Sequence, residues 1–242
     1  MIREFCRRGV FASALWLILT ISAHLNAESH IATPVNADAV VRQLRDVPTE
    51  MYVGPLSWLC ASSPCPRPPV PEGEIRKRKV YAQLFSLGTT GVPALARALR
   101  SPDPKLRHGV ALALSALSGG WWSWEGNPAT VDIRAALPTL MTTLNDSDPD
   151  MRGLAAEAVG NIGPYAAKAV PALVKLLRDD DEAVRISACE GLLHIGPAAS
   201  GALPELRRAQ SDPSSALQRC ARMAIDALEG VQDFPVWISP IS

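Results

Sequence analysis

The chain has 242 residues, 48% of them apolar and only 5% aromatic, which suits one elongated domain whose core is built from small and aliphatic side chains. Lysine plus arginine and aspartate plus glutamate balance at 24 each, so no basic excess indicates a nucleic-acid partner. The sequence contains no P-loop, no G-x-S-x-G and no C-x-x-C-H, which argues against nucleotide, hydrolase and covalent haem chemistry. We therefore expect neither a cofactor nor a metal centre.

Residues 1–27 have the layout of a secretory signal peptide. Arginines precede an apolar stretch at residues 10–21, and the small residues Ala23 and Ala27 follow as candidate cleavage positions. The stretch is shorter than the roughly 20 residues that a membrane-spanning helix needs. We expect an exported protein, periplasmic or secreted, with no membrane span after cleavage. Retention of the segment as an anchor is the alternative.

Residues 28–73 are expected to hold a short amphipathic helix at 37–46 and then a proline-rich linker. The crowded prolines favour extended polyproline geometry. Cys60 and Cys65 lie in this linker and are candidates for a disulfide in an oxidising compartment. A helix at residues 74–87 would be the second half of a degenerate first repeat, with 37–46 as its separated partner.

The rest of the chain repeats itself. Matching segments are anchored by Pro93, Pro138, Pro171 and Pro204, and the last three prolines are evenly spaced. Each segment predicts a helix with proline in its first turn, a turn with a capping Asp or Ser, and a second helix. Such units cannot bury their apolar faces alone. The sequence therefore predicts an all-α fold, an α-solenoid of stacked antiparallel helix pairs over residues 74–230, followed by a tail at 231–242.

An aspartate and an arginine recur at fixed offsets from the prolines. These residues are Asp103, Arg107, Asp148, Arg152, Asp181 and Arg185. Because periodic copies fill the same stacking position in every unit, we interpret them as structural, each arginine binding the turn aspartate of its own or an adjacent repeat. The last copy has Ser214 and Gln218 instead, which suits a terminal cap.

The pattern V/L-P-x-L, L-x-D-x-D-x-x-V/M/L-R-x-x-A/V and I-G-P resembles HEAT-like repeats, in the short bacterial form named after phycobilin lyases. The resemblance covers about residues 88–230. It implies a right-handed stack of helix pairs that holds protein partners, with the second helices lining a concave surface. It implies no catalytic residue.

The interval from Pro93 to Pro138 is longer than the standard unit. The excess falls at residues 119–131, and its tryptophans are Trp121, Trp122 and Trp124. Insertions in a solenoid lie on loops and often on a binding face, and tryptophan is enriched in binding hot spots. The insertion is a candidate partner-binding site, unless its rings fold back to cover the gap between repeats.

A second candidate is the row of polar residues on the outward side of the second helices. The row comprises His108, Glu157, Asn161, Glu190, His194, Arg219 and Asp226. Glu190 and His194 are four residues apart on one helix, a spacing compatible with sharing a metal, yet no motif completes such a site. A solvated groove wall is the simpler interpretation.

Cys189 and Cys220 fall near small-residue core positions of consecutive second helices, and we expect them to be buried free thiols.

The leading hypothesis is a non-catalytic interaction scaffold of the cell envelope that binds a protein or peptide through the concave face and the Trp-rich insertion. One alternative is a lyase-type enzyme or enzyme subunit, similar to the bilin lyases that carry such repeats. Another is an envelope protein whose tryptophans stack on carbohydrate. The export signal and the lack of a matching constellation of residues speak against the lyase.

Overall fold

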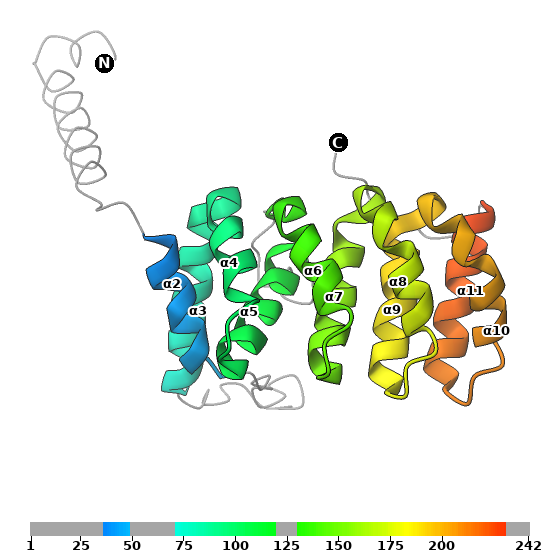
Figure 1. Cartoon of the computed structure of the whole chain (residues 1–242), viewed down its shortest axis with the longest axis horizontal. Coiled ribbons are helices and arrows are strands. Elements are labelled where there is room, and N and C mark those ends of the chain that lie inside the picture. The colour runs from blue at the N-terminus through cyan, green and yellow to red at the C-terminus, as the bar shows by residue number, and fades with distance from the viewer. Residues whose placement is uncertain (1–35, 49–70, 120–129, 231–242) are drawn as a thin grey trace, which may run out of the picture. The chain divides into compact units, whose positions relative to one another are not determined.

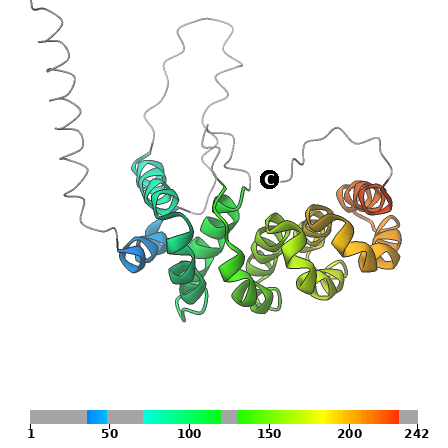
Figure 2. The same ribbon diagram turned by 90° about the horizontal axis from the view of Figure 1, so that it is seen from above.

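A computed structural model describes residues 36–48, 71–119 and 130–230. Every element in these ranges is an α-helix or a 3-10 helix, as the sequence predicts. Figure 1 shows antiparallel helix pairs in chain order, from α2 and α3 at one end to α10 and α11 at the other, and Figure 2 shows the same row from above. None of the described helices is long and apolar enough to cross a bilayer.

Several predictions of the sequence concern residues outside these ranges. They are the signal peptide, the Cys60–Cys65 pair, the tryptophans Trp121, Trp122 and Trp124, and the C-terminal tail. All of them stay predictions.

The first helical pair is split along the chain. Helix α2 (Ala37–Gln43) continues into the 3-10 turn η2 (Leu44–Asp46), and its partner is α3 (Glu72–Leu87). Helix α2 packs against α3, and η2 packs against the second helix of the following repeat. A methyl group at Gly109 of that following helix would overlap the carbonyl of Leu44, so glycine is required for this close contact.

Four further pairs follow within the described residues. Their first helices are α4 (Val92–Ala98), α6 (Leu137–Thr143), α8 (Val170–Leu176) and α10 (Leu203–Ala209). Their second helices are α5 (Pro104–Leu117), α7 (Pro149–Asn161), α9 (Glu182–Ile195) and α11 (Ser215–Glu229). The 3-10 segments η4 (Gly88–Gly91), η6 (Arg134–Ala136), η7 (Gly163–Ala169) and η8 (Gly196–Ala202) lead into the first helices.

Local side chains explain where the second helices begin and end. The carboxylate of Asp181 accepts hydrogen bonds from the N–H groups of Ala183 at 2.8 Å and Val184 at 3.1 Å, and so caps α9. Asp103, Asp148 and Ser214 cap α5, α7 and α11 in the same way. Helices α7 and α9 are followed by Gly163 and Gly196, whose φ angles of 68° and 69° favour glycine.

The second helices form one layer, in which α5, α7, α9 and α11 each pack against the next. Each first helix packs against the second helix of its own pair, so the first helices form a second layer. The leucine stripe expected from the sequence lies between the layers at Leu95, Leu140, Leu173 and Leu206, each at most 1% exposed. Small residues occupy the matching positions of the second helices, where Ala155, Ala188 and Ala221 are fully buried.

The arginines of the repeats connect neighbouring turns. Arg152 donates through Nη1 to the carbonyls of Asp146 and Ser147 in its own turn, at 3.0 and 3.1 Å. It also donates through Nε and Nη2 to the carboxylate of Asp179 in the next turn, at 2.8 and 2.7 Å. Arg185 likewise donates through Nη1 to carbonyls of its own turn, and it donates through Nη2 to the carboxylate of Asp212 at 3.3 Å. The carboxylate partners are therefore two residues before the capping positions that the sequence analysis singled out.

We expect Asp179→Asn to lower the free energy of unfolding by about 3 kcal/mol at neutral pH, because Arg152 would keep a mostly buried charge without the carboxylate that it hydrogen-bonds. The pair is mostly buried, with the two side chains 17% and 10% exposed. Hydrogen bonds from Arg152 hold the pKa of Asp179 below its ordinary value. The contribution is therefore complete above the unfolded pKa of about 3.9 and is lost as pH falls through the lower folded pKa.

Urea unfolding at pH 7 and at pH 3 would measure this contribution. The control is Glu205→Gln. Its partners Arg178 and Arg208 are 62% and 70% exposed, so the loss of unfolding free energy should stay below about 1 kcal/mol. Equal losses in the two variants would contradict the structural role of the buried pair.

The prediction of free thiols at Cys189 and Cys220 is wrong. The two cysteines form a disulfide that joins α9 to α11, with their Cα atoms 6.2 Å apart. They stand at different offsets from Pro171 and Pro204, so they are not equivalent positions of the repeat and come from opposite sides of one interface between repeats. The two cysteines face each other across this interface, which the position of each one within its own repeat does not indicate.

Candidate functional site

A row of polar side chains crosses the outer face of three consecutive second helices, and we call it the polar row. Its members are Ser115 of α5, Ser118 at the end of that helix, Glu157 and Asn161 of α7, and Glu190 and His194 of α9. The last four occupy equivalent positions of consecutive repeats, in two helices that pack directly together. The repeat itself therefore places the carboxyls beside each other.

The approach of α7 to α9 is unusually close because glycines meet there. A methyl group on Gly160 would lie 2.5 Å from the Cα atom of Gly191. One on Gly191 would lie 2.9 Å from the carbonyl oxygen of Ala156. Helix backbones in contact leave little room between them, so the polar residues that flank the glycines are held near one another.

Hydrogen bonds tie the α5 end of the polar row to α7. The Asn161 side chain donates through Nδ2 to the Ser118 hydroxyl at 3.0 Å, and this hydroxyl donates to the Ser115 carbonyl at 2.8 Å. Both serines are buried. The two serines are neither charged nor aromatic, and they lie one position before and two positions after the repeat position that corresponds to Asn161. The repeat pattern alone therefore does not place them beside Glu157 and Asn161.

The carboxyls of the polar row are shifted toward their neutral forms. Burial raises the pKa of Glu157, and a hydrogen bond with Ser115 opposes this shift. Burial and the nearby charge of Glu157 raise the pKa of Glu190. Burial lowers the pKa of His194, even though this side chain and Glu190 keep exposed surface. A neutral histidine cannot neutralise either carboxylate, and neither Glu157 nor Glu190 has an ion-pair partner among the described residues.

We expect Glu157→Gln and Glu190→Gln to raise the melting temperature at pH 7. A carboxyl whose pKa is raised by folding contributes stability that is complete below its unfolded pKa, about 4.3, and is lost as pH rises through the folded pKa. The glutamine of each variant does not titrate, so the variants do not lose this stability as pH rises. Thermal unfolding from pH 4 to pH 8 should show a gap between variant and native protein that is widest at pH 8 and closes near pH 4. A lower melting temperature at pH 7 would contradict this.

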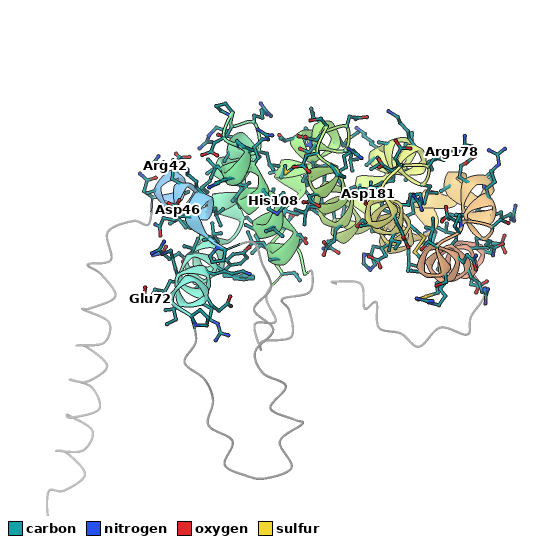
Figure 3. All side chains as sticks on the ribbon, turned by 90° about the horizontal axis from the view of Figure 1, so that it is seen from below. Arg42, Asp46, Glu72, His108, Arg178 and Asp181 are labelled. Carbon is teal, nitrogen blue, oxygen red and sulfur yellow. A yellow bond between two sulfur atoms is a disulfide. The ribbon has the colours of Figure 1, made fainter. Side chains whose placement is uncertain are left out.

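A hollow of about 310 Å³ lies on the same face, near the N-terminal ends of α7 and α9. Its lining includes His108, Leu112, Gly153, Leu154, Val184 and Ser187. Figure 3 labels two of the lining residues, His108 of α5 and Asp181, which caps the N-terminus of α9. Gly153 and Glu157 are four residues apart on α7, so the hollow and the polar row are one helical turn apart.

The structure thus divides the predicted groove residues into three groups. Glu157, Asn161, Glu190 and His194 come together in the polar row, and His108 lines the hollow. Arg219 and Asp226 lie on α11, the last helix of the described residues, where Arg219 contacts Ser215 of its own helix at 3.5 Å. Among the described residues, no three or more histidine, cysteine, aspartate or glutamate side chains are arranged to hold a metal ion.

The ends of the Trp-containing insertion are described, although residues 120–129 are not. The N–H of Val131 donates to the carbonyl of Leu117 at 2.7 Å, which brings the two ends of the insertion together. Ser118, the hydrogen-bond partner of Asn161, directly precedes the insertion. The two candidate sites of the sequence analysis therefore meet at Ser118.

Two larger hollows, of about 590 and 450 Å³, lie between the first helices and the turns. Both are lined by Arg178 and Glu205, which form an ion pair at 2.6 Å, and by Asp179, the partner of Arg152. Because these charges already have partners in the chain, the hollows are weaker candidates for a partner-binding site.

Antiparallel helix pairs that repeat along the chain and stack through a shared core define an α-helical repeat solenoid. Residues 137–229 match the family model of HEAT repeats. No curated protein matches the sequence.

Solved structures with the same fold include designed and natural proteins. An engineered protein is 26% identical with a TM-score of 0.52, and the match covers 63% of this chain and 67% of that chain. A designed armadillo repeat protein in complex with the peptide (KR)4 is 19% identical with a TM-score of 0.51, covering 79% and 81%. The complex of CpcE and CpcF of phycocyanin lyase from Nostoc sp. PCC7120 is 19% identical with a TM-score of 0.52, covering 83% and 67%.

Proposed function

We propose that the protein is a non-catalytic interaction scaffold that binds an extended peptide or protein segment across α5, α7 and α9. The observation that carries the proposal is the position of the hollow one helical turn from the polar row, in which Glu157 and Glu190 lack an ion-pair partner among the described residues. Glu157 is half-buried without an ion-pair partner, which costs stability, and a bound partner would supply the missing contact to it and to the exposed Glu190. The peptide complex of the similar designed repeat protein supports this mode of binding.

The Trp-rich insertion is proposed as a second contact for the same partner. It begins beside Ser118 in the polar row, and tryptophan provides a large rigid contact area. We further propose that the protein acts outside the cytoplasm, in the periplasm or as a secreted protein. The layout of residues 1–27 and the Cys189–Cys220 disulfide support this location, because disulfides persist mainly in oxidising compartments.

The alternative is a lyase-type enzyme or subunit, for which the likeness to CpcE and CpcF is the starting point. A carboxyl with a raised pKa, such as Glu157, is the kind of group that general acid catalysis needs. A visible absorbance band on the purified protein or after incubation with a bilin would favour this alternative. Quenching of tryptophan fluorescence by envelope glycans would favour a carbohydrate-binding protein instead.

Selection of random linear peptides displayed on phage tests the scaffold proposal. We expect the mature chain to enrich peptides that bind it with affinities of the order of micromolar. Gly153→Leu, which fills the hollow, should weaken these peptides, and so should a folded Trp121→Ala, Trp122→Ala, Trp124→Ala variant. The control is Asp226→Asn on α11. Failure to enrich any peptide, or unchanged binding by the Gly153→Leu variant, would overturn the proposal.

A further inference from the structure

We propose that the hollow and the polar row form a subsite for a single lysine or arginine side chain of the bound peptide. The inference rests on the proposed function and names the chemical class of the partner. Its two parts are an apolar channel for the aliphatic stem of the basic residue and carboxylates for its charged end.

The channel exists because of one residue. The equivalent position of the four proline-anchored repeats is occupied by His108, Gly153, Ile186 and Arg219, so only the second of these repeats lacks a side chain there. A methyl group on Gly153 would meet nothing closer than the Ser187 hydroxyl at 3.6 Å, which leaves the space above it open. Leu112, Leu154 and Val184 supply apolar walls of the hollow from three helices.

The charged side chains that line the hollow are of one sign. Asp150 and Asp181 line the hollow, and Glu157 and Glu190 follow one helical turn further along α7 and α9. No lysine or arginine belongs to the lining that the structure describes. The nearby arginines of these helices, Arg152 and Arg185, are held by Asp179 and Asp212 in the turns.

A basic side chain fits both parts at once. Lysine and arginine bury their methylene stems along apolar surface while the charged group remains with polar partners. Charge-assisted hydrogen bonds to carboxylates are about twice as strong as neutral ones. An apolar side chain would leave the carboxylates Glu157 and Glu190 without a counter-charge, and an acidic one would be repelled.

Fluorescence anisotropy with a labelled peptide of alternating serine and arginine tests the subsite on the full mature chain. The matched probe replaces arginine with citrulline, which keeps the shape and removes the charge. We expect the arginine peptide to bind about tenfold more tightly than the citrulline peptide. Gly153→Leu should weaken the arginine peptide about tenfold because it fills the channel, and the double variant Glu157→Gln, Glu190→Gln should do so because it removes the paired charges.

Two control variants separate the subsite from general attraction between charges. Asp226→Asn removes one carboxylate on α11 and should change the affinity less than about twofold. Gly153→Ala adds one methyl group to the channel and should weaken the arginine peptide less than Gly153→Leu does. Far-UV circular dichroism and thermal unfolding establish that each variant is folded.

The outcomes distinguish this inference from the scaffold proposal. If peptides from the display selection bind at Gly153 but tolerate replacement of every arginine and lysine, the scaffold stands and the basic subsite is wrong. If Asp226→Asn weakens the arginine peptide as much as the double variant does, the attraction is not local and the subsite is wrong. If no peptide of either kind binds, both proposals fall.

Discussion

The Gly160→Ala variant is expected to unfold more easily than the native protein, although alanine favours a helix more than glycine does. The new methyl group would lie 2.5 Å from the Cα atom of Gly191, and a backbone atom cannot move aside as a flexible side chain can. Overpacking of this kind costs about 3 kcal/mol and helix propensity returns roughly 1 kcal/mol, so the net loss of unfolding free energy is about 2 kcal/mol. The loss follows from the contact between α7 and α9 and not from α7 itself.

A matched control exists in the same helix. Gly153→Ala places its methyl group in ordinary contact, 3.6 Å from the Ser187 hydroxyl. This variant should therefore gain up to about 1 kcal/mol of unfolding free energy from the higher helix propensity of alanine, with no cost from overpacking. Urea unfolding of the two variants and the native protein gives both differences. If Gly160→Ala and Gly153→Ala raised the free energy of unfolding by the same amount, α7 and α9 would be further apart than the contact between Gly160 and Gly191 indicates.

The same contact matters for the proposed site. Glu157 and Glu190 lie three and one residues from Gly160 and Gly191, so a shift of α9 away from α7 would separate the two carboxyls. The Gly160→Ala variant should therefore bind the arginine peptide less tightly even where it remains folded. Because neither glutamate is altered in this variant, the loss of affinity would result from the changed spacing of the two carboxylates.

Removal of the disulfide in a Cys189→Ala, Cys220→Ala variant is expected to cost about 3–4 kcal/mol of unfolding free energy. The cysteines are 31 residues apart, and closing a loop of this length restricts the unfolded chain by an amount of that size. Cys189 is fully buried and Cys220 nearly so, and alanine resembles the residues that the neighbouring repeats place at core positions. The loss should therefore come mainly from the missing covalent link.

The effect should be concentrated at the C-terminal end. Repeat units contact only their neighbours, and α11 is the last described helix. Hydrogen exchange should speed up in α10 and α11 of the variant and stay unchanged in α5, and a reducing agent should have the same effect on the native protein. Alkylation of both cysteines in folded, unreduced protein would show that the disulfide is absent.

The fold was accessible from the sequence because its determinants are local and repeated. Proline in the first turn, a capping aspartate and glycine after the last turn each act within a few residues, and the regular spacing of the prolines shows that the units stack. The same counting placed Glu157 and Glu190 at equivalent positions of neighbouring second helices. Residues of one type at one repeat position are bound to become neighbours once the units stack.

The contacts that define the site were decided by the tertiary structure. The hydrogen bond between Asn161 and Ser118 spans 43 residues and a repeat of irregular length, and Arg152 binds Asp179, which the repeat pattern did not distinguish from the capping aspartates. The disulfide and the open channel at Gly153 likewise depend on how closely the helices approach and which way they are rotated. Periodicity determines which residues belong to a face, whereas backbone distances set by glycine contacts determine which of them touch.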